Sequence, residues 1–435
     1  MKTILETYHQ DIAWLEGLNN IPRKNYMLGP SSRSIFIQRL QNFLNLLGNP
    51  EKKLKFIHVT GTAGKGSTVN LLHDLIFASG KKVGSYTSPF ATTTIEKFRV
   101  NNELISPQIF HQILEEKIKP ALDQYILKYK TETPSYFELC LSIALLYFKK
   151  EKCDLVILEA GLGGLHDATN VIPPPIVSTI TNIGLDHTEI LGKTKEAIAN
   201  DKAGIIKKGS IFLTSEKNQK LIQIFKERCA EKKAKFIALK NLSQNYSEGK
   251  YFATKQQNTN LNLVLNILEV LKIKVDNIQK VINNFQLICR QEIIQDKPQV
   301  ILDGAHNADK LGNLIDFIKK QKYQKLHLIF AAAEDKHYLG ALKKLLPEVD
   351  YLYLTRFNNP FRKSASLKTL FTQCQKIKKI PSQVFHDSEM ALSSALKKAK
   401  KNDLIVICGS FFLAGLLRKN WLSEEEIIKN LSSTK

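Results

Sequence analysis

The chain has 435 residues, 43% of them hydrophobic, so it is long enough for two or three domains with buried cores. Charged side chains interrupt its first residues, and no apolar run is long enough to cross a bilayer, so we expect neither export nor a membrane span. Six scattered cysteines without a C-x-x-C pair argue against a disulfide framework and a zinc site, and they favour the reducing cytoplasm.

The net charge of +22 leaves three interpretations open. Lysine pairs are spread over the whole length, which is typical of solvated faces and helix ends. A basic surface also attracts anionic small substrates. A nucleic-acid partner is the third interpretation, but no aromatic and basic module accompanies the charge, so we expect none.

Apolar runs alternate with helical patterns along the chain, which indicates α/β domains with parallel sheets. Strands of the first half are expected at 54–59, 82–87, 154–159, 177–182 and 211–214, with helices at 67–79 and from about 255. Strands of a second series are expected at 300–302, 326–330, 351–354 and 404–408. Two domains are the simplest account, and we place them at 1–287 and 288–435, with the junction near 286–298.

A glycine-rich segment follows the first expected strand and opens the first helix. Its residues are Gly61, Thr62, Ala63, Gly64, Lys65, Gly66, Ser67 and Thr68. Glycines let successive backbone N–H groups converge on an anion, and the helix N-terminus adds partial positive charge. Lys65 offers a cation and Ser67 a hydroxyl for Mg²⁺, so the segment predicts a polyphosphate nucleotide site. Gly66 is an extra residue between them, compared with the usual spacing.

Polar residues at the ends of expected strands are further candidates, because open α/β sheets bind ligands there. Glu159 is a candidate metal ligand or, alternatively, a cap on the next turn. His187 is a candidate ligand or a hydrogen-bonded loop histidine. Asp303 and His306 are equally compatible with a functional and an ordinary loop role, and Lys202 by itself is most simply a helix lysine.

Taken in order, these segments resemble the folylpolyglutamate synthase and dihydrofolate synthase branch of the Mur ligase family. The resemblance covers nearly the whole chain and is carried by GTAGKGST (61–68), SYTSP (85–89), SYFE (135–138), EAGLGGLHDATNVI (159–172), the segment 181–209, LDGAHN (302–307) and CGSFFLAG (408–415). It implies a P-loop-containing N-terminal ATP-binding domain with a substrate loop, and a smaller Rossmann-like α/β C-terminal domain.

The resemblance also implies roles for individual residues. Those implied to bind ATP are Gly61, Thr62, Gly64, Lys65, Gly66, Ser67, Thr68, Asn260, Arg290 and Asp303, with Asn258 an alternative for the adenine contact. Those implied to bind Mg²⁺, as one ion or two, are Ser88, Glu159 and His187. Lys202 would be carbamylated and would act in catalysis with Lys65 and His306. Phe137 and Glu138 would border the pterin or folate site.

The implied activity is ATP-dependent ligation of L-glutamate to folates through an acyl phosphate, with release of ADP and phosphate. Whether dihydropteroate is a second acceptor stays open, and the alternatives are another Mur-type amino-acid ligase and a P-loop kinase or NTPase. We expect a cytoplasmic monomer. Ala63, Phe90 and Cys289 replace the family's usual Asn, His and Gly, and 28–33 matches the family's substrate loop only loosely.

Overall fold

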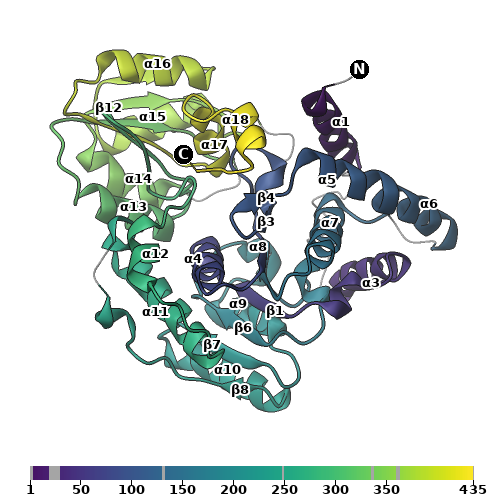
Figure 1. Ribbon diagram of the computed structural model, residues 1–435. Coiled ribbons are helices and arrows are strands. Elements are labelled where there is room, and N and C mark those ends of the chain that lie inside the picture. Colours follow the sequence, from purple (N-terminus) through teal and green to yellow (C-terminus); the bar gives the residue numbers. More distant parts are fainter. Residues whose placement is uncertain are drawn as a thin grey trace. The chain divides into compact units, whose positions relative to one another are not determined.

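The computed structural model describes residues 3–18, 30–129, 133–246, 249–334, 338–358 and 363–434. Leu28 and Gly29 of the expected substrate loop lie outside these ranges. The chain divides into two units (Figure 1). Unit 1 comprises residues 1–90, 94–248 and 257–284, and unit 2 comprises 91–93, 249–256 and 285–435.

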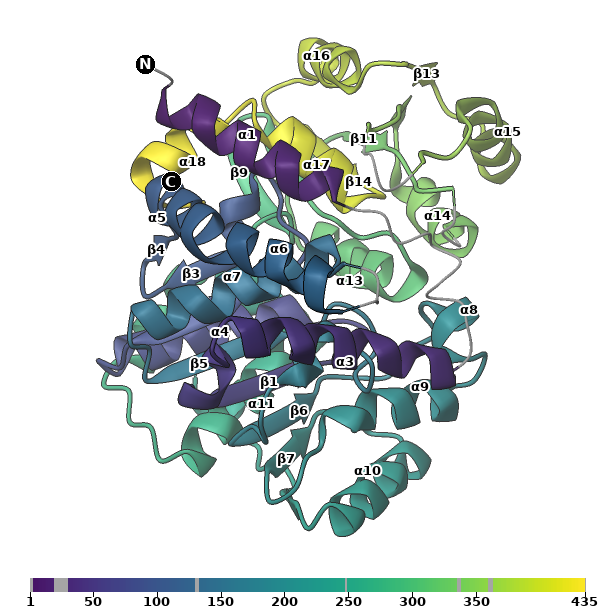
Figure 2. The ribbon, with the colours of Figure 1, turned by 90° about the vertical axis from the view of Figure 1, so that its right-hand side faces the viewer.

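Unit 1 contains one eight-stranded sheet with the strand order β4-β3-β2-β5-β1-β6-β7-β8. Its strands are β1 (Phe56–Thr60), β2 (Val83–Tyr86), β3 (Phe98–Val100), β4 (Glu103–Leu104), β5 (Leu155–Glu159), β6 (Val177–Ile180), β7 (Ile211–Thr214) and β8 (Lys235–Phe236). The strands from β2 to β8 in this order are parallel, and only the pairs β2–β3 and β3–β4 are antiparallel. The ends of β1, β5 and β6 therefore meet at one edge of the sheet, and Figure 2 shows these strands side by side.

Helices pack on this sheet and on one another because their apolar faces need partners. They are α1 (Ile4–Gly17), α3 (Pro30–Leu46), α4 (Lys65–Ala78), α5 (Pro107–Ile113), a π-helix (Leu114–Ile118), α6 (Lys119–Lys128), α7 (Tyr136–Lys150), α8 (Thr188–Leu191), α9 (Lys195–Lys202), α10 (Gln219–Glu231), α11 (Lys255–Val270) and α12 (Ile278–Asn284). One core cluster joins Phe212 of β7 to Ile198 of α9 and Phe225 of α10, all of them fully buried.

Unit 2 contains a six-stranded sheet with the order β13-β12-β11-β14-β10-β9, in which only β9 is antiparallel. Its strands are β9 (Glu292–Asp296), β10 (Gln299–Leu302), β11 (Leu326–Phe330), β12 (Tyr351–Leu354), β13 (Ser382–Val384) and β14 (Leu404–Cys408). Its helices are α13 (Ala308–Ile318), α14 (Leu339–Leu345), α15 (Leu367–Ile377), α16 (Ser388–Lys398), α17 (Phe411–Arg418) and α18 (Glu424–Asn430).

Both faces of the unit 2 sheet are buried, as its nearly continuous apolar strands require. Leu328 and Phe330 of β11 belong to a cluster with side chains of α13, α14 and α15. Ile329, between them, belongs to a second cluster with side chains of α16 and α17. In Figure 1, α13 and α14 accordingly lie on one side of β12 and α16 on the other.

The predicted mixed α/β architecture is confirmed, with small differences at the strand boundaries. The strand expected at 177–182 ends at Ile180, and Thr181 and Asn182 hydrogen-bond to Ala63 of the glycine-rich segment. All six cysteines are buried and form no disulfide. Within the described ranges, every helix is too short or too polar to span a membrane.

Candidate active site

The glycine-rich segment forms a tight turn between β1 and α4. Gly64 has a φ of 84°, in the left-handed region that favours glycine. A Cβ atom on Gly64 would lie 2.7 Å from Asn260 Oδ1, and one on Gly61 would lie 1.8 Å from Thr181 Oγ1. Glycine is therefore favoured at both positions, and the Asn260 side chain lies directly against the turn.

Side chains from the end of β6 fix the backbone of this turn. The Ala63 N–H donates to Asn182 Oδ1 at 2.8 Å, and the Thr181 hydroxyl donates to the Ala63 carbonyl at 2.6 Å. The Thr62 hydroxyl accepts from the Gly184 N–H at 2.9 Å. The turn thus has a defined shape without any ligand, and Ala63 contributes through its backbone alone.

Two features place positive charge at the N-terminus of α4, namely its uncapped N–H groups and the Lys65 ammonium. Gly64 precedes the helix and has no side chain to cap it, so the first-turn N–H groups point out of the helix end. The Lys65 ammonium donates to the Gly61 carbonyl at 3.0 Å and so lies over the turn. Ser67 is half-buried and Thr68 fully buried. This arrangement matches the needs of a polyphosphate.

Glu159 lies beside the same helix end. It is the last residue of β5, is only 6% exposed, and accepts a hydrogen bond from the Ser88 N–H at 3.3 Å. A Cβ atom on Gly66 would lie 3.6 Å from Glu159 Oε2, so the glycine leaves space between helix and carboxylate. Carboxylate and hydroxyl oxygens are the ligands that Mg²⁺ prefers, so the residues present here fit a magnesium ion next to phosphate groups.

Lys202, at the end of α9, is buried near Lys65 of the glycine-rich segment. Burial, and secondarily the Lys65 charge, lowers the pKa of the Lys202 amine to about 7. The neighbouring Asp201 carboxylate accepts from the Gly164 N–H at 2.9 Å. The structure therefore gives Lys202 an amine that is substantially neutral near pH 7.

His187, the third predicted metal ligand, lies after β6 and directly before α8. It has a left-handed φ of 52°, and its Nε2 lies 3.9 Å from Asp186 Oδ1. Among the described residues, the one cluster of three His, Cys, Asp or Glu ligand atoms is Asp11, His111 and Glu115, away from the glycine-rich turn. The role of His187 in binding metal thus stays a prediction.

Phe137 and Glu138 differ sharply in exposure. Phe137 is 50% exposed, whereas the buried Glu138 carboxylate accepts from Arg39 Nε at 3.0 Å and from the Ser135 N–H at 2.7 Å. Glu138 therefore caps α7 and pairs with a buried arginine. Beside Phe137, the buried Lys97 ammonium lies 4.3 Å from the Tyr136 ring centroid. Of the two predicted substrate residues, Phe137 is the one able to meet a ligand.

In unit 2, the predicted residues gather at the end of β10. The buried Asp303 carboxylate accepts from the Gln291 N–H at 2.9 Å and the Ala305 N–H at 2.6 Å. Burial raises the pKa of Asp303, and the charge of Arg290 opposes this shift. The Arg290 guanidinium lies 4.7 Å from the Phe411 ring centroid.

His306 is oriented by its own loop. Its Nδ1 lies 2.8 Å from the Gly304 carbonyl, and its Nε2 lies 3.2 Å from Lys310 Nζ. Because a carbonyl can only accept, Nδ1 is the donor and Nε2 the acceptor that faces the lysine. Arg290, Asp303 and His306 therefore form one polar group within unit 2.

Comparisons with known proteins identify the family. The Mur ligase middle domain matches residues 59–285, and the glutamate ligase domain of the Mur ligases matches residues 289–411. The chain belongs to the Mur ligase family.

Relatives of this Mur ligase place it in the branch that the sequence predicted. It is 31% identical to the dihydrofolate synthase/folylpolyglutamate synthase of Bacillus subtilis, over 95% of this chain and 99% of the relative. E. coli FolC, solved in complex with DHPP and ADP, has 26% identity and a TM-score of 0.79, with coverage of 94% of this chain and 97% of FolC. The folylpolyglutamate synthase of Thermotoga maritima also has 26% identity and a TM-score of 0.79, with coverage of 96% and 97%.

Two features of this Mur ligase could not be derived from the sequence. Cys289, where the family usually has glycine, has a left-handed φ of 51°, which explains why glycine suits the position. The Arg39–Glu138 ion pair joins residues 99 positions apart. The S-x-x-E pattern of Ser135 and Glu138, typical of a helix N-terminus, is the sequence signal that could have indicated the structural role of Glu138.

Proposed function

We propose that the site around the glycine-rich segment 61–68 catalyses the ligation of L-glutamate to folates through an acyl phosphate, with ADP and phosphate as products. The chain is an ATP-dependent ligase of the folylpolyglutamate and dihydrofolate synthase branch. The observation that carries the proposed chemistry is the N-terminus of α4, where Lys65 lies over the turn and Glu159 lies beside Gly66. Dihydropteroate is proposed as a second acceptor, because several relatives are named for both activities.

ATP would lie along the first turn of α4. The residues proposed to bind its phosphates are Gly61, Thr62, Gly64, Lys65, Gly66, Ser67 and Thr68. Asn260 is proposed for the adenine side, and its side chain is already held against Gly64. Arg290 and Asp303 are the proposed nucleotide contacts of the domain at 288–435, and the domain at 1–287 would hold the phosphates.

Ser88, Glu159 and His187 would hold Mg²⁺, as one ion or two. Bound there, the ion supplies positive charge to the phosphate oxygens. Lys202 is proposed to react with CO₂: the neutral amine nitrogen bonds to carbon, and a proton leaves to solvent. The product is an anionic carbamate, which adds oxygen ligands where an ammonium stood. The low pKa of Lys202 supports this step, because only the neutral amine reacts.

The reaction would then proceed in two transfers. The substrate carboxylate attacks the γ-phosphorus of ATP and ADP leaves, while Lys65 compensates the charge on the transferred group. The glutamate amine next attacks the acyl carbon, and phosphate leaves with the former carboxylate oxygen. His306 would help to position the reactants. An acyl-enzyme is disfavoured, because every cysteine is buried and so unavailable as a nucleophile.

The experiment that tests this function measures ADP release with and without glutamate. A ligase of this kind releases ADP only when acceptor and glutamate are both present, and forms one amide per ADP. Tetrahydrofolate and dihydropteroate are assayed side by side to fix the acceptor. ADP release that is independent of glutamate would indicate a kinase or NTPase instead, and activity with a different amino acid would indicate another Mur-type ligase.

A further inference from the structure

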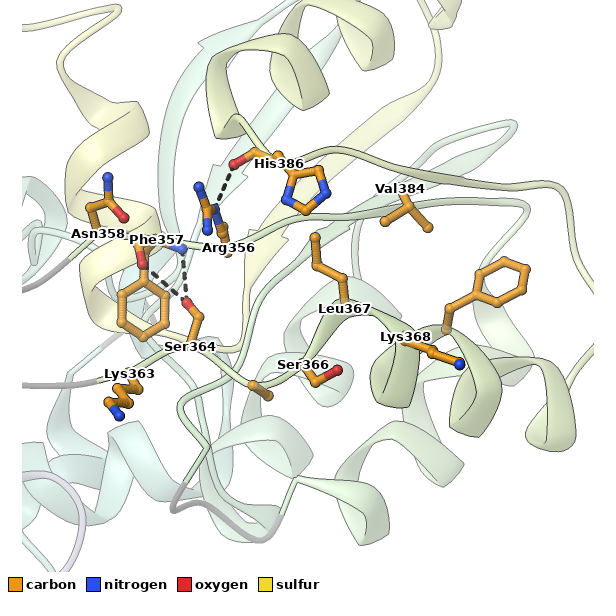
Figure 3. Close-up of a pocket in the computed structure, with 12 residues that line it drawn as sticks. Arg356, Phe357, Asn358, Lys363, Ser364, Ser366, Leu367, Lys368, Val384 and His386 are labelled. Carbon is orange, nitrogen blue, oxygen red and sulfur yellow. Dashed lines mark hydrogen bonds between the residues drawn. The ribbon is translucent and has the colours of Figure 1, made fainter.

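A pocket of unit 2 lies away from the Asp303 and His306 group. It opens where β12 and β13 end, has a volume of about 800 Å³, and is drawn in Figure 3. In the sheet order, β11 and β14 separate β12 from β10, the strand that Asp303 follows. The pocket is therefore a second candidate site on the same sheet, and no motif in the sequence pointed to it.

The pocket is basic. Arg356, Lys363, Lys368 and His386 line it, and none of the twelve lining residues is acidic. Among the residues that the structure describes, Lys363 and Lys368 take part in no ion pair, and both are exposed. Arg356 Nε donates to the His386 carbonyl at 3.0 Å, which holds the guanidinium at the pocket (Figure 3). Uncompensated cations around a hollow favour an anionic ligand.

Large apolar side chains lie beside these cations, because Phe371 follows Lys368 by one turn of α15 and Val384 precedes His386 by two residues. Phe371 of α15 is 38% exposed and Val384 at the end of β13 is 43% exposed, although both are large hydrophobic residues. Next to Arg356, the Ser364 hydroxyl accepts from the Phe357 N–H at 2.9 Å and donates to the Phe357 carbonyl at 3.1 Å, which fixes that side of the pocket (Figure 3). A ligand that contacts both the cations and these apolar side chains must carry anionic and apolar groups close together.

We propose that this pocket binds the γ-linked glutamate tail of a folate polyglutamate. The inference rests on the proposed function, which makes such a tail both substrate and product. Each γ-linked residue carries one α-carboxylate, which would pair with Lys363, Lys368 or Arg356, and two methylene groups, which would lie on Phe371 and Val384. Inorganic phosphate offers the charge but no methylene groups for Phe371 and Val384.

The direct test is calorimetric titration of the full chain with a γ-linked tetraglutamate that carries no pterin. In the double variant Lys363→Ala/Lys368→Ala, the dissociation constant should rise about tenfold or more, because two exposed cations are lost from the binding surface. The matched control Lys343→Ala/Lys344→Ala removes the same charge from α14 and should bind as the wild type does.

Two outcomes of this titration would overturn the proposal. One is equal loss of affinity in both double variants, which would mean that net charge alone attracts the peptide. The other is equal affinity for an α-linked tetraglutamate or for an RNA oligonucleotide, which would indicate a general polyanion surface. Weaker binding of both, combined with loss only in the Lys363→Ala/Lys368→Ala variant, supports the tail.

Kinetics separate this proposal from the proposed function. With a triglutamate acceptor, KM in Lys363→Ala/Lys368→Ala should rise about fivefold while kcat stays within about twofold, because only ground-state binding is lost. With a monoglutamate acceptor, both constants should stay near the wild-type values. If the wild type ligates neither acceptor, the proposed function fails and the titration still decides the pocket. An active ligase with no tetraglutamate binding contradicts the tail proposal alone.

Discussion

In both units a parallel strand leads through a loop into a helix, but the two helix N-termini differ in capping. We call the uncapped N-terminus of α4 the open end and the capped N-terminus of α13 the closed end. In unit 1, Gly64 leaves the end of α4 without a side-chain cap, and Lys65 adds positive charge. In unit 2, the Asn307 side chain accepts from the Lys310 N–H and caps α13, and the buried Asp303 accepts two backbone N–H groups.

The same strand, loop and helix arrangement therefore gives two kinds of helix N-terminus. A helix end that carries its own acceptors is satisfied by the protein, whereas one that ends on glycine keeps its N–H groups for a ligand. The residue types before the helix therefore distinguish the two ends, and we expect phosphate at the N-terminus of α4.

Removing the added charge at the open end should have the largest effect. Lys65→Ala should lower kcat by about a hundredfold or more, because the lysine compensates charge on the transferred phosphoryl group. Steady-state ADP release measures this, with the exposed Lys81→Ala as the control that should behave as the wild type. If Lys65→Ala had a near wild-type rate and an intact circular dichroism spectrum, Lys65 would not compensate charge on the transferred group.

Acidification should reverse the proposed modification of Lys202. Its pKa lies below the ordinary value of 10.5, at about 7, so the folded protein gains the proton only as the pH falls through that value. The neutral fraction is about tenfold lower at pH 6 than at pH 8, and carbamate and activity should fall with it. Labelling with ¹³C-bicarbonate and recording the carbamate signal by NMR checks this.

Lys202 should also make the free energy of unfolding depend on pH. The direction is opposite to that of a salt-bridged lysine, whose contribution to stability falls as the pH rises. Between about pH 7 and 10.5 the unfolded chain binds the extra proton, so the free energy of unfolding should rise with pH. Lys202→Met should lose this slope and the carbamate signal together. A carbamate signal that persists in Lys202→Met, or one that does not change with pH, would show that the carbamate forms on another amine.

A side chain placed at the open end should weaken both stability and nucleotide binding. Gly64→Ala combines left-handed strain of about 1–2 kcal/mol with displacement of Asn260, whose Oδ1 lies 2.7 Å from the new Cβ. Gly80→Ala is the matched control, because Gly80 has a φ of 83° and nothing within 4 Å of its Cβ position. Urea unfolding should show the strain in both, and only Gly64→Ala should lose ADP affinity. Equal ADP affinity in both would remove Asn260 from the site.

At the closed end, removing the cap should cost stability and little more. Asn307→Ala should lower the free energy of unfolding by about 1 kcal/mol, the usual value of an N-cap. Asn307→Asp keeps the acceptor and should unfold as the wild type does. If Asn307→Ala matched the wild type in urea while Asn307→Asp did not, the capping role would be wrong.

The sequence predicted most of the parallel strands because they are apolar on both faces. The run at 154–159 is an example, and it became β5. It did not predict β3, β4, β8, β9 or β13, which are short or only partly buried and so carry a weak pattern. Nor did it predict that residues 91–93 and 249–256 belong to unit 2, since only contacts distant in sequence decide that.

The candidate site shows the same limit. The glycine-rich turn could be predicted because its function depends on residues that are adjacent in sequence. The Asn260 contact with Gly64 and the Lys65 charge near Lys202 depend on segments distant in sequence, and only the family resemblance suggested Asn260 or a special role for Lys202. The pocket beside β12 has no sequence pattern, because its cations come from separate segments.

The most direct test of the account follows one oxygen atom. With an acceptor labelled with ¹⁸O in the carboxylate that becomes the amide, an acyl phosphate transfers one label to inorganic phosphate for each amide formed. We therefore expect the label in inorganic phosphate, with ADP as the nucleotide product. Label in AMP, with pyrophosphate released, would show adenylation and contradict phosphoryl transfer at the N-terminus of α4.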